Sequence, residues 1–229
     1  MAAQANATDW TGPYIGVHAG YGWGNADTTI DSLPLGAAGG FATANAGVKP
    51  KGGTGGAQAG YNWQDNSLVF GLEADISKTK MKQTTTVTPL LLIPGVIPQP
   101  GTFTSASHNI SWISTFRARL GLDVGNDLLL YGTGGVAWGN VKSSGNSWAT
   151  LGGVNYPYSQ SKTKTGWAIG GGMEWAFNPS TSFKVEYLYV NLGKQQAIAN
   201  PVPANPPWQT LSRWKTKASI LRAGFNLMF

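Results

Sequence analysis

Eight charged residues stand in short apolar stretches, most of them two positions from another charge, and their types make them the first candidates for chemistry. They are Glu73, Asp75, Arg117, Arg119, Glu174, Lys184, Glu186 and Arg222. Carboxylates that lie close together can act as a general acid and base, and a row of such groups can carry protons or ions. Four acidic and four basic side chains can equally pair as a network of salt bridges.

Few other residues could support catalysis or metal binding. The chain has no cysteine, which excludes a thiol nucleophile, a disulfide framework and a zinc site with cysteine ligands. Its two histidines are His18 and His108, and no serine, histidine and acid occur at a spacing that would bring them together. We therefore predict no catalytic residue, no metal site and no cofactor, and we do not expect an enzyme.

The segments that must position these residues follow a period of two. Apolar and polar residues alternate over eight stretches, which predicts eight β-strands. The predicted strands span residues 13–25, 55–64, 68–80, 108–123, 128–141, 164–177, 181–192 and 214–229. Three short gaps rich in Asn, Asp, Gly or Pro predict tight turns, and four long gaps predict loops.

The two faces of the predicted strands differ in a way that favours a membrane protein. One face is apolar, free of charge in mid-strand and ends in aromatic residues, whereas the other gathers both signs of charge beside many glycines. Charged residues make up 11% of the chain, where a soluble globular protein has about 25%. A soluble β-sandwich is the alternative, but an apolar band outside and a polar interior are typical of an outer-membrane barrel. We predict an all-β fold, an eight-stranded antiparallel up-and-down transmembrane β-barrel with four long outer loops and three short periplasmic turns.

Several short motifs within the strands resemble those of one protein family. They are Thr11–Gly16, Gly71–Asp75, Arg117–Gly121, Leu130–Gly135, Gly170–Glu174, Lys184–Tyr189 and Arg222–Phe225, the last closing on Phe229. The chain resembles the small outer-membrane β-barrel domain proteins, the porin-family or opacity-like surface antigens, and more narrowly their alphaproteobacterial group in Brucella and rhizobia. The resemblance implies the outer membrane of a Gram-negative bacterium, and an assembly signal at Phe229 for the barrel-assembly machinery. Since the N-terminus shows no signal peptide, we expect a mature exported chain.

The expected barrel width decides how the eight charged residues are interpreted. An eight-stranded barrel is only wide enough for side chains to fill it. We therefore interpret the eight residues as a lumen charge network that plugs the barrel, with a narrow porin-like channel for small solutes or ions as the alternative. Some relatives bind haem, so the resemblance adds a lesser alternative, in which His108 near the outer rim is an axial ligand. A lipid-modifying enzyme is favoured least.

The remaining charges divide between the two ends of the predicted barrel. Twelve basic residues lie in or beside the long loops with two aspartates, whereas four aspartates and no basic residue lie near the short turns. The outer end therefore carries about +10 and the inner end about −4, which resolves the net charge of +6. We expect Lys78, Lys80, Lys82, Lys215 and Lys217 to contact phosphates of lipopolysaccharide, although a generic solvated rim explains them equally well. Nucleic acid is not an expected partner.

The long loops are apolar rather than charged at their tips. Residues 83–116, 143–161 and 195–212 contain no charged side chain, yet they include Leu90–Ile93, Tyr158 and Trp208. Such patches predict contacts with a partner protein or with neighbouring barrels, unless the loops pack on one another and cap the barrel. We assign residues 1–10 to a periplasmic tail and 11–229 to the barrel. The predicted function is a structural surface protein that supports envelope integrity and outer-surface contacts.

Overall fold

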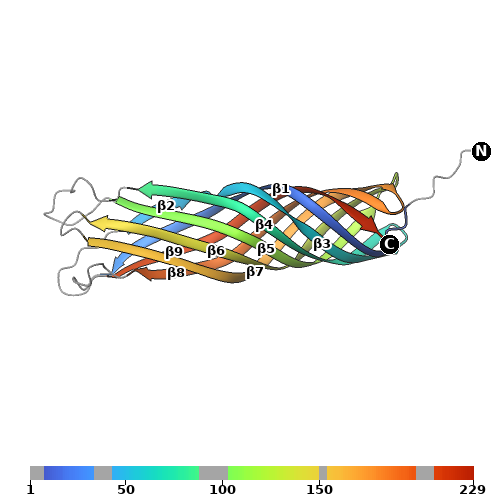
Figure 1. The fold of residues 1–229 in the computed structure, drawn as a ribbon. Coiled ribbons are helices and arrows are strands. Elements are labelled where there is room, and N and C mark those ends of the chain that lie inside the picture. Colours follow the sequence, from blue (N-terminus) through green and yellow to red (C-terminus); the bar gives the residue numbers. More distant parts are fainter. Residues whose placement is uncertain (1–7, 34–42, 88–102, 150–153, 200–208) are drawn as a thin grey trace, which may run out of the picture.

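The structure is a computed structural model that describes residues 8–33, 43–87, 103–149, 154–199 and 209–229. These residues form nine strands (Figure 1). The strands are β1 (Gly12–Leu33), β2 (Thr43–Val48), β3 (Lys51–Asp65), β4 (Leu68–Val87), β5 (Phe103–Asp123), β6 (Leu128–Ala149), β7 (Val154–Asn178), β8 (Thr181–Ala199) and β9 (Gln209–Met228). No helix long and apolar enough to cross a membrane occurs in the described residues.

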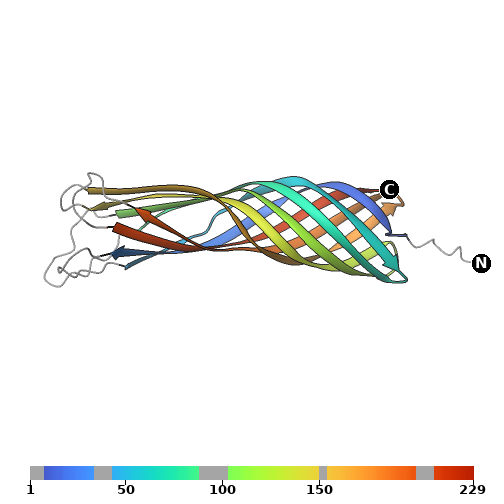
Figure 2. The same ribbon diagram turned by 90° about the horizontal axis from the view of Figure 1, so that it is seen from below.

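Eight of the strands close into an antiparallel ring. Each strand from β3 to β9 pairs with the next along the chain, and β1 joins β3 on one side and β9 on the other. Figures 1 and 2 show a long, strongly twisted tube whose β1 begins and β9 ends at the same end. We call this the turn end, because the three short turns lie there, and the opposite end the loop end. The predicted eight-stranded up-and-down topology is confirmed.

The pairing register fixes the tilt of the strands. Tyr14 of β1 pairs with a residue of β3, and that residue pairs with one of β4. Following such pairs once around the ring leads back to β1 at Gly24, ten positions further along the strand. The intermediate partners are Gly60, Glu73, Arg117, Gly135, Ala168, Val190 and Ala218. A stagger of this size requires strands that tilt by roughly 35–45° from the barrel axis. The tilt brings residues from many strands to one height inside the barrel.

The strands extend further toward the loop end than the sequence predicted. β4 continues through Gln83–Val87 and β6 through Ser143–Ala149, segments that we predicted to be loops. Gln83–Val87 is rich in threonine and so keeps β-propensity. Ser143–Ala149 consists mostly of serine, glycine and asparagine and is a strand through its pairing with both β5 and β7. Neither segment shows the apolar and polar alternation that marks a membrane face. The predicted loops 25–55, 81–107, 142–163 and 193–213 are therefore too long.

The additional strand, β2, is an interrupted continuation of β3. β2 pairs with residues 26–31 of β1, directly beyond the segment of β1 that pairs with β3. Lys49 and Pro50 separate the two strands, and proline lacks the N–H that a ladder requires. The Pro50 carbonyl still accepts a hydrogen bond from Gly24 N at 2.7 Å. β2 lies within the predicted loop 25–55, so the strand predicted over 55–64 extends toward the loop end as β3 and then as β2.

The outward face forms an apolar band between two sets of aromatic side chains. At the turn end, Trp63 packs on Phe70 with ring centroids 5.6 Å apart. Toward the loop end, Trp23 contacts Tyr187 and Trp167 contacts Tyr189, at centroid distances of 6.3 and 5.5 Å. We call Trp23, Trp167, Tyr187 and Tyr189 the loop-end aromatic ring. The band predicted from alternation is confirmed.

One face assignment was wrong. Ile110 was expected on the same outward face as Phe116, but the structure buries it in the interior. A register shift between Ile110 and Trp112 inserts an extra residue in β5 and reverses the alternation beyond it. Because Ser111 separates Ile110 from Trp112, the sequence still alternates across the bulge and gives no sign of it.

Candidate functional site

Arg117 lies at the centre of the charged network inside the barrel. Its guanidinium donates to Glu73 at 2.5 Å, to Asp75 at 3.0 Å and to Glu186 at 3.1 Å. These carboxylates come from β4, which pairs with β5, and from β8, three strands beyond β5 in the ring. Since all four side chains are almost completely buried, each charge depends on the others for its stability.

Arg222 and Lys184 complete this half of the network. Arg222 donates to both carboxylates that flank it, with Nε 2.7 Å from Glu186 Oε2 and Nη1 3.2 Å from Asp75 Oδ1. Lys184 Nζ lies 2.8 Å from Glu73 Oε2. Every one of these carboxylates therefore receives charge-assisted hydrogen bonds from more than one cation.

Arg119 and Glu174 form a second ion pair nearer the turn end. The Arg119 guanidinium lies over the Tyr131 ring, 3.8 Å from its centroid. Glu174 Oε1 also accepts from Ser182 Oγ and Asn226 Nδ2, each at 2.5 Å. The structure thus brings together all eight of the predicted lumen residues: Glu73, Asp75, Arg117, Arg119, Glu174, Lys184, Glu186 and Arg222.

The polar partners that complete the network were not predicted from the sequence. Tyr14 donates to Glu73 at 2.8 Å and Tyr131 donates to Glu186 at 3.1 Å. His18, expected to face the lumen, donates from Nδ1 to Gln58 Oε1 at 2.9 Å and lies 3.3 Å from Arg222 Nη1. The signal was available, because these residues occupy inward positions of the same alternation. Their spacing along the chain does not reveal which charge each one contacts.

Apolar side chains close the interior on both sides of the network. At the turn end, Trp10 is 2% exposed and packs with Val69 and Leu129. Toward the loop end, the inward positions that follow Glu186 on β8 are Leu188, Val190 and Leu192. They belong to an apolar layer with Met81, Ile110, Ile113, Ala137, Val141, Ala168, Ala218 and Ile220. Described side chains therefore fill the lumen from the turn end to beyond the loop-end aromatic ring.

This apolar layer was also missed in the sequence. The segment Tyr187–Val190 is apolar or aromatic on both faces of the strand, so no alternation marks the inner one. The loss of alternation was itself the available signal, because a strand in a polar water-filled lumen keeps a polar inner face. The filled interior argues against the narrow channel considered above.

A further group of side chains lies above the apolar layer, toward the loop end. His108 of β5 is 1% exposed, its Nδ1 lies 2.9 Å from Ser143 Oγ, and its ring meets the Trp214 ring edge-on at 5.5 Å. Tyr158 of β7 stacks on Trp214 at 6.3 Å. We call His108, Tyr158 and Trp214 the outer aromatic cluster. Tyr158 was predicted to lie in a loop but belongs to β7 and is buried in the interior, whereas Leu90–Ile93 and Trp208 lie outside the described residues.

This geometry does not suit His108 as a haem ligand. The imidazole is enclosed by Trp214 and held by Ser143, so an iron atom could reach it only after that packing opened. In the part of the chain that the structure describes, no three acidic or histidine side chains are grouped for a metal ion.

The burial of His108 predicts a loss of stability in acid. Burial lowers the pKa of His108 from 6.5 to about 4, so the unfolded chain takes up a proton at a higher pH than the folded chain. Stability from this residue is complete above about pH 6.5 and falls as the pH drops toward 4, by about 3 kcal/mol. We expect urea unfolding in detergent micelles to show a larger loss between pH 7 and pH 4 for the wild type than for His108→Gln. Equal losses in the two proteins would contradict this assignment.

The whole chain matches a known family, and named relatives of the chain are outer-membrane proteins. Residues 1–229 match the family described as the outer membrane protein beta-barrel domain. The chain belongs to this family. The 31 kDa outer-membrane immunogenic protein of Brucella melitensis is 37% identical over 201 residues, which cover 86% of this chain and 77% of that protein. The 22 kDa outer membrane protein of Rhizobium leguminosarum bv. viciae is 28% identical over 132 residues, covering 58% and 49%.

A solved structure supports the fold of this outer-membrane barrel. The outer membrane protein OprG from Pseudomonas aeruginosa has a TM-score of 0.52 and 13% identity, covering 97% of this chain and 99% of that one. The family match and the relatives from Brucella and Rhizobium show that the protein is an outer-membrane β-barrel of a Gram-negative bacterium, as predicted. The turn end lies in the periplasm and the loop end faces outward.

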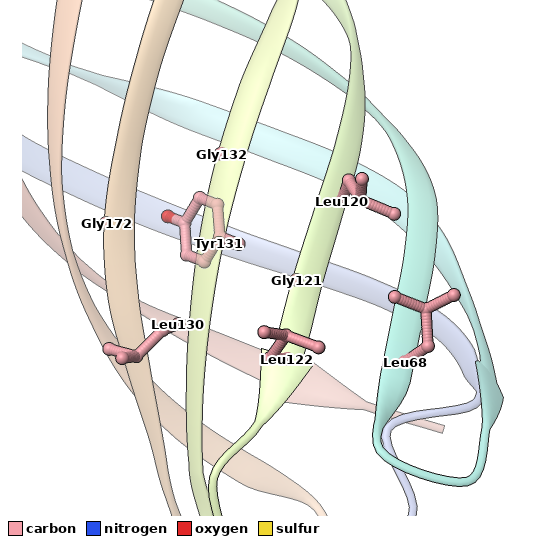
Figure 3. A pocket seen from close by; sticks show the side chains of 8 residues that line it. All are labelled: Leu68, Leu120, Gly121, Leu122, Leu130, Tyr131, Gly132 and Gly172. Atoms are coloured by element: carbon pink, nitrogen blue, oxygen red, sulfur yellow. The ribbon is translucent and has the colours of Figure 1, made fainter.

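The lipid-facing surface of the barrel carries a shallow apolar groove near the periplasm. Figure 3 shows Leu68, Leu120, Leu122 and Leu130 around it, with Gly132 exposed between them. The groove has a volume of about 440 Å³ and contains no charged side chain. A surface of this kind suits acyl chains of the inner leaflet and offers no group for chemistry.

The outer end of the barrel carries the predicted basic rim, which consists of Lys78, Lys80, Lys82, Lys215 and Lys217. Lys78, Lys80 and Lys82 are exposed and continue the outward face of β4 beyond Ile76. Lys215 and Lys217 continue the outward face of β9 and are half-buried. The rim lies next to the loop-end aromatic ring, where the head groups of the outer leaflet begin.

Proposed function

We propose that this barrel is a structural, non-catalytic surface protein whose basic rim holds phosphate groups of lipopolysaccharide. The filled interior supports a structural role, because a barrel packed with salt bridges and apolar side chains offers no path for solutes. The names of the relatives fit this role, since they describe outer-membrane immunogenic proteins rather than enzymes.

Two lysine pairs at the outer end carry the proposal for phosphate binding. Lys51 lies directly opposite Lys82 on neighbouring strands, and Lys194 lies directly opposite Lys215. Like charges placed opposite each other across two strands destabilise a sheet. An anion between them removes this cost, and the outer leaflet supplies phosphates at this height.

Replacing the five rim lysines tests this proposal. A Lys near an anionic membrane surface contributes about 1 kcal/mol of attraction, so we expect Lys→Gln at all five positions to weaken lipopolysaccharide binding at least about tenfold. The variant should also lose most of the salt dependence of binding, because dissolved salt screens these charges at the barrel surface. Titration of the detergent-solubilised protein with lipopolysaccharide at low and high salt measures both effects.

The control changes the charge only at the other end of the barrel. Asp65 and Asp123 lie at the periplasmic turns, and their replacement by Asn changes the net charge without touching the rim. We expect this variant to bind lipopolysaccharide as the wild type does. Unchanged affinity and salt dependence in the five-lysine variant would refute the proposal.

The C-terminal residue remains a predicted assembly signal. The Phe229 side chain is 73% exposed on the lipid-facing side, and its backbone N donates to the Pro13 carbonyl at 3.0 Å. The ring is thus accessible to the barrel-assembly machinery when β1 and β9 come together.

A further inference from the structure

A second apolar groove lies beside the one in Figure 3, also on the lipid-facing surface near the periplasm. It has a volume of about 460 Å³ and contains no charged side chain. Its lining includes Val124 and Asn126 of the β5–β6 turn, Met173 and Trp175 of β7, and Phe183 of β8. We call the groove in Figure 3 the first groove and this one the second groove.

The two grooves meet at one pair of neighbouring residues. Leu130 of β6 lines the first groove, and its ladder partner Met173 of β7 lines the second. These two side chains are 43% and 51% exposed, so they project from the wall between the grooves. Gly132, two positions beyond Leu130, leaves the first groove open, since the nearest atom to an added Cβ there would be 3.9 Å away. Two adjoining grooves divided by one pair of side chains fit the two acyl chains of a single phospholipid.

The second groove reaches the β5–β6 turn, at the level of the inner-leaflet head groups. Asn126 of this turn is exposed, and its side chain forms no hydrogen bond with the described residues. An amide N–H donor of this kind suits a phosphate, which every phospholipid carries. The next residue, Asp127, accepts from Thr8 Oγ1 at 2.6 Å through Oδ1, while its Oδ2 has no partner in the described part of the chain. The groove therefore leads from apolar side chains to a free donor and a free acceptor.

The charge of the turn end distinguishes between kinds of head group. Four aspartates lie there, and no lysine or arginine occurs in the described turns or in residues 8–11. These aspartates are Asp9, Asp65, Asp123 and Asp127. They attract a head group that carries an ammonium group, such as ethanolamine, and repel one with a net negative charge, such as phosphatidylglycerol. Charge complementarity therefore favours a zwitterionic phospholipid.

We propose that the two grooves form a binding site for one inner-leaflet phospholipid with an ethanolamine head group. Its acyl chains fill the grooves on either side of Leu130 and Met173, its phosphate accepts a hydrogen bond from Asn126, and its ammonium group contacts Asp127. A second copy of the barrel suits the grooves less well, because a two-fold symmetric contact would bring the aspartates of both copies together. The site lies at the opposite end from the basic rim and does not depend on the proposed function.

Competition between two phospholipids with identical acyl chains tests the choice of head group. The full-length barrel is placed in mixed micelles with equal amounts of phosphatidylethanolamine and phosphatidylglycerol, and native mass spectrometry identifies the lipids that stay bound. We expect complexes with one lipid to contain phosphatidylethanolamine about fivefold more often than phosphatidylglycerol. Equal amounts of the two lipids, or an excess of phosphatidylglycerol, would overturn the proposal.

Asp127→Asn tests the contact with the ammonium group. Asparagine tolerates the φ of 58° at this position and can still accept from Thr8, so the turn should keep its conformation. We expect the preference for phosphatidylethanolamine to fall from about fivefold to less than about twofold. Asp9→Asn removes the same charge from an exposed residue that lines neither groove, and it should keep the wild-type preference. The same preference in both variants would overturn the assignment of Asp127.

Filling the first groove tests where the acyl chains lie. Gly132→Phe places a ring in this groove, so we expect the fraction of barrels that retain a lipid to fall at least about fivefold. Gly134→Phe adds the same ring at the next outward position of β6, outside both grooves, and should leave lipid retention unchanged. Wild-type retention in Gly132→Phe would overturn the proposal. A wild-type dimer that Gly132→Phe dissociates would also overturn it, because a second barrel would then be the occupant.

Discussion

Replacing Arg117 by methionine is expected to lower the free energy of unfolding of the barrel by about 3–5 kcal/mol. The substitution keeps a long side chain in the lumen but removes the cation that contacts Glu73, Asp75 and Glu186. Their negative charges would then face one another at the level of the membrane, with Arg222 and Lys184 as the nearby cations. Urea unfolding in detergent micelles, followed by tryptophan fluorescence, measures the loss.

A matched control distinguishes the loss of the charged network from the loss of any one positive charge. Lys142→Met removes the same charge from an exposed position at the outer end of β6 and should change the stability by no more than about 0.5 kcal/mol. Adding Glu186→Gln to Arg117→Met should recover part of the loss, because it removes one of the uncompensated carboxylates. A loss in Arg117→Met no greater than in Lys142→Met would show that the network does not hold the barrel together.

Replacing Gly135 by valine is expected to prevent folding or to cost at least about 1–3 kcal/mol. Gly135 faces the lumen beside the charged network, and a Cβ there would lie 2.7 Å from the Cα of Arg117. That neighbour is backbone of the adjacent strand, so it cannot turn aside as a flexible side chain would. Heat-modifiable migration on gels and urea unfolding report the folded fraction and its stability.

Replacing the adjacent glycine, Gly134, is expected to have the opposite effect on stability. Gly134 faces the lipid, and the nearest atom to an added Cβ is the Ala168 carbonyl oxygen at 3.7 Å, an ordinary contact distance. Gly134→Val should leave stability unchanged or raise it by up to about 1 kcal/mol, since valine favours a strand and contacts acyl chains. Similar losses in Gly134→Val and Gly135→Val would contradict the inward and outward assignment of β6.

The sequence by itself determined where the strands and turns lie and which face of a strand each side chain occupies. Alternation with a period of two located all eight barrel strands, and it placed Glu73, Arg117 and Arg222 on the inner face. Turn residues such as Asn126 and Asp127, which have φ values of 54° and 58°, marked a periplasmic turn. These features are local, because a side chain's face follows from its position in the strand and a turn from its own few residues.

Only the tertiary structure decided which inward residues meet. Arg117 and Glu186 are 69 positions apart in the chain, and Tyr158 and Trp214 are separated by most of two strands. Their contacts depend on the pairing register, which shifts by ten residues over one turn around the ring. This shift is the sum over all eight pairs of strands, so no single strand determines it. The bulges at Ile110 and at Asn191 to Lys194 also affect contacts between strands: one turns Ile110 into the apolar layer, and the other lies where the ladder between β7 and β8 ends. The alternation specifies two faces, but the closure of the barrel specifies the neighbours on the inner one.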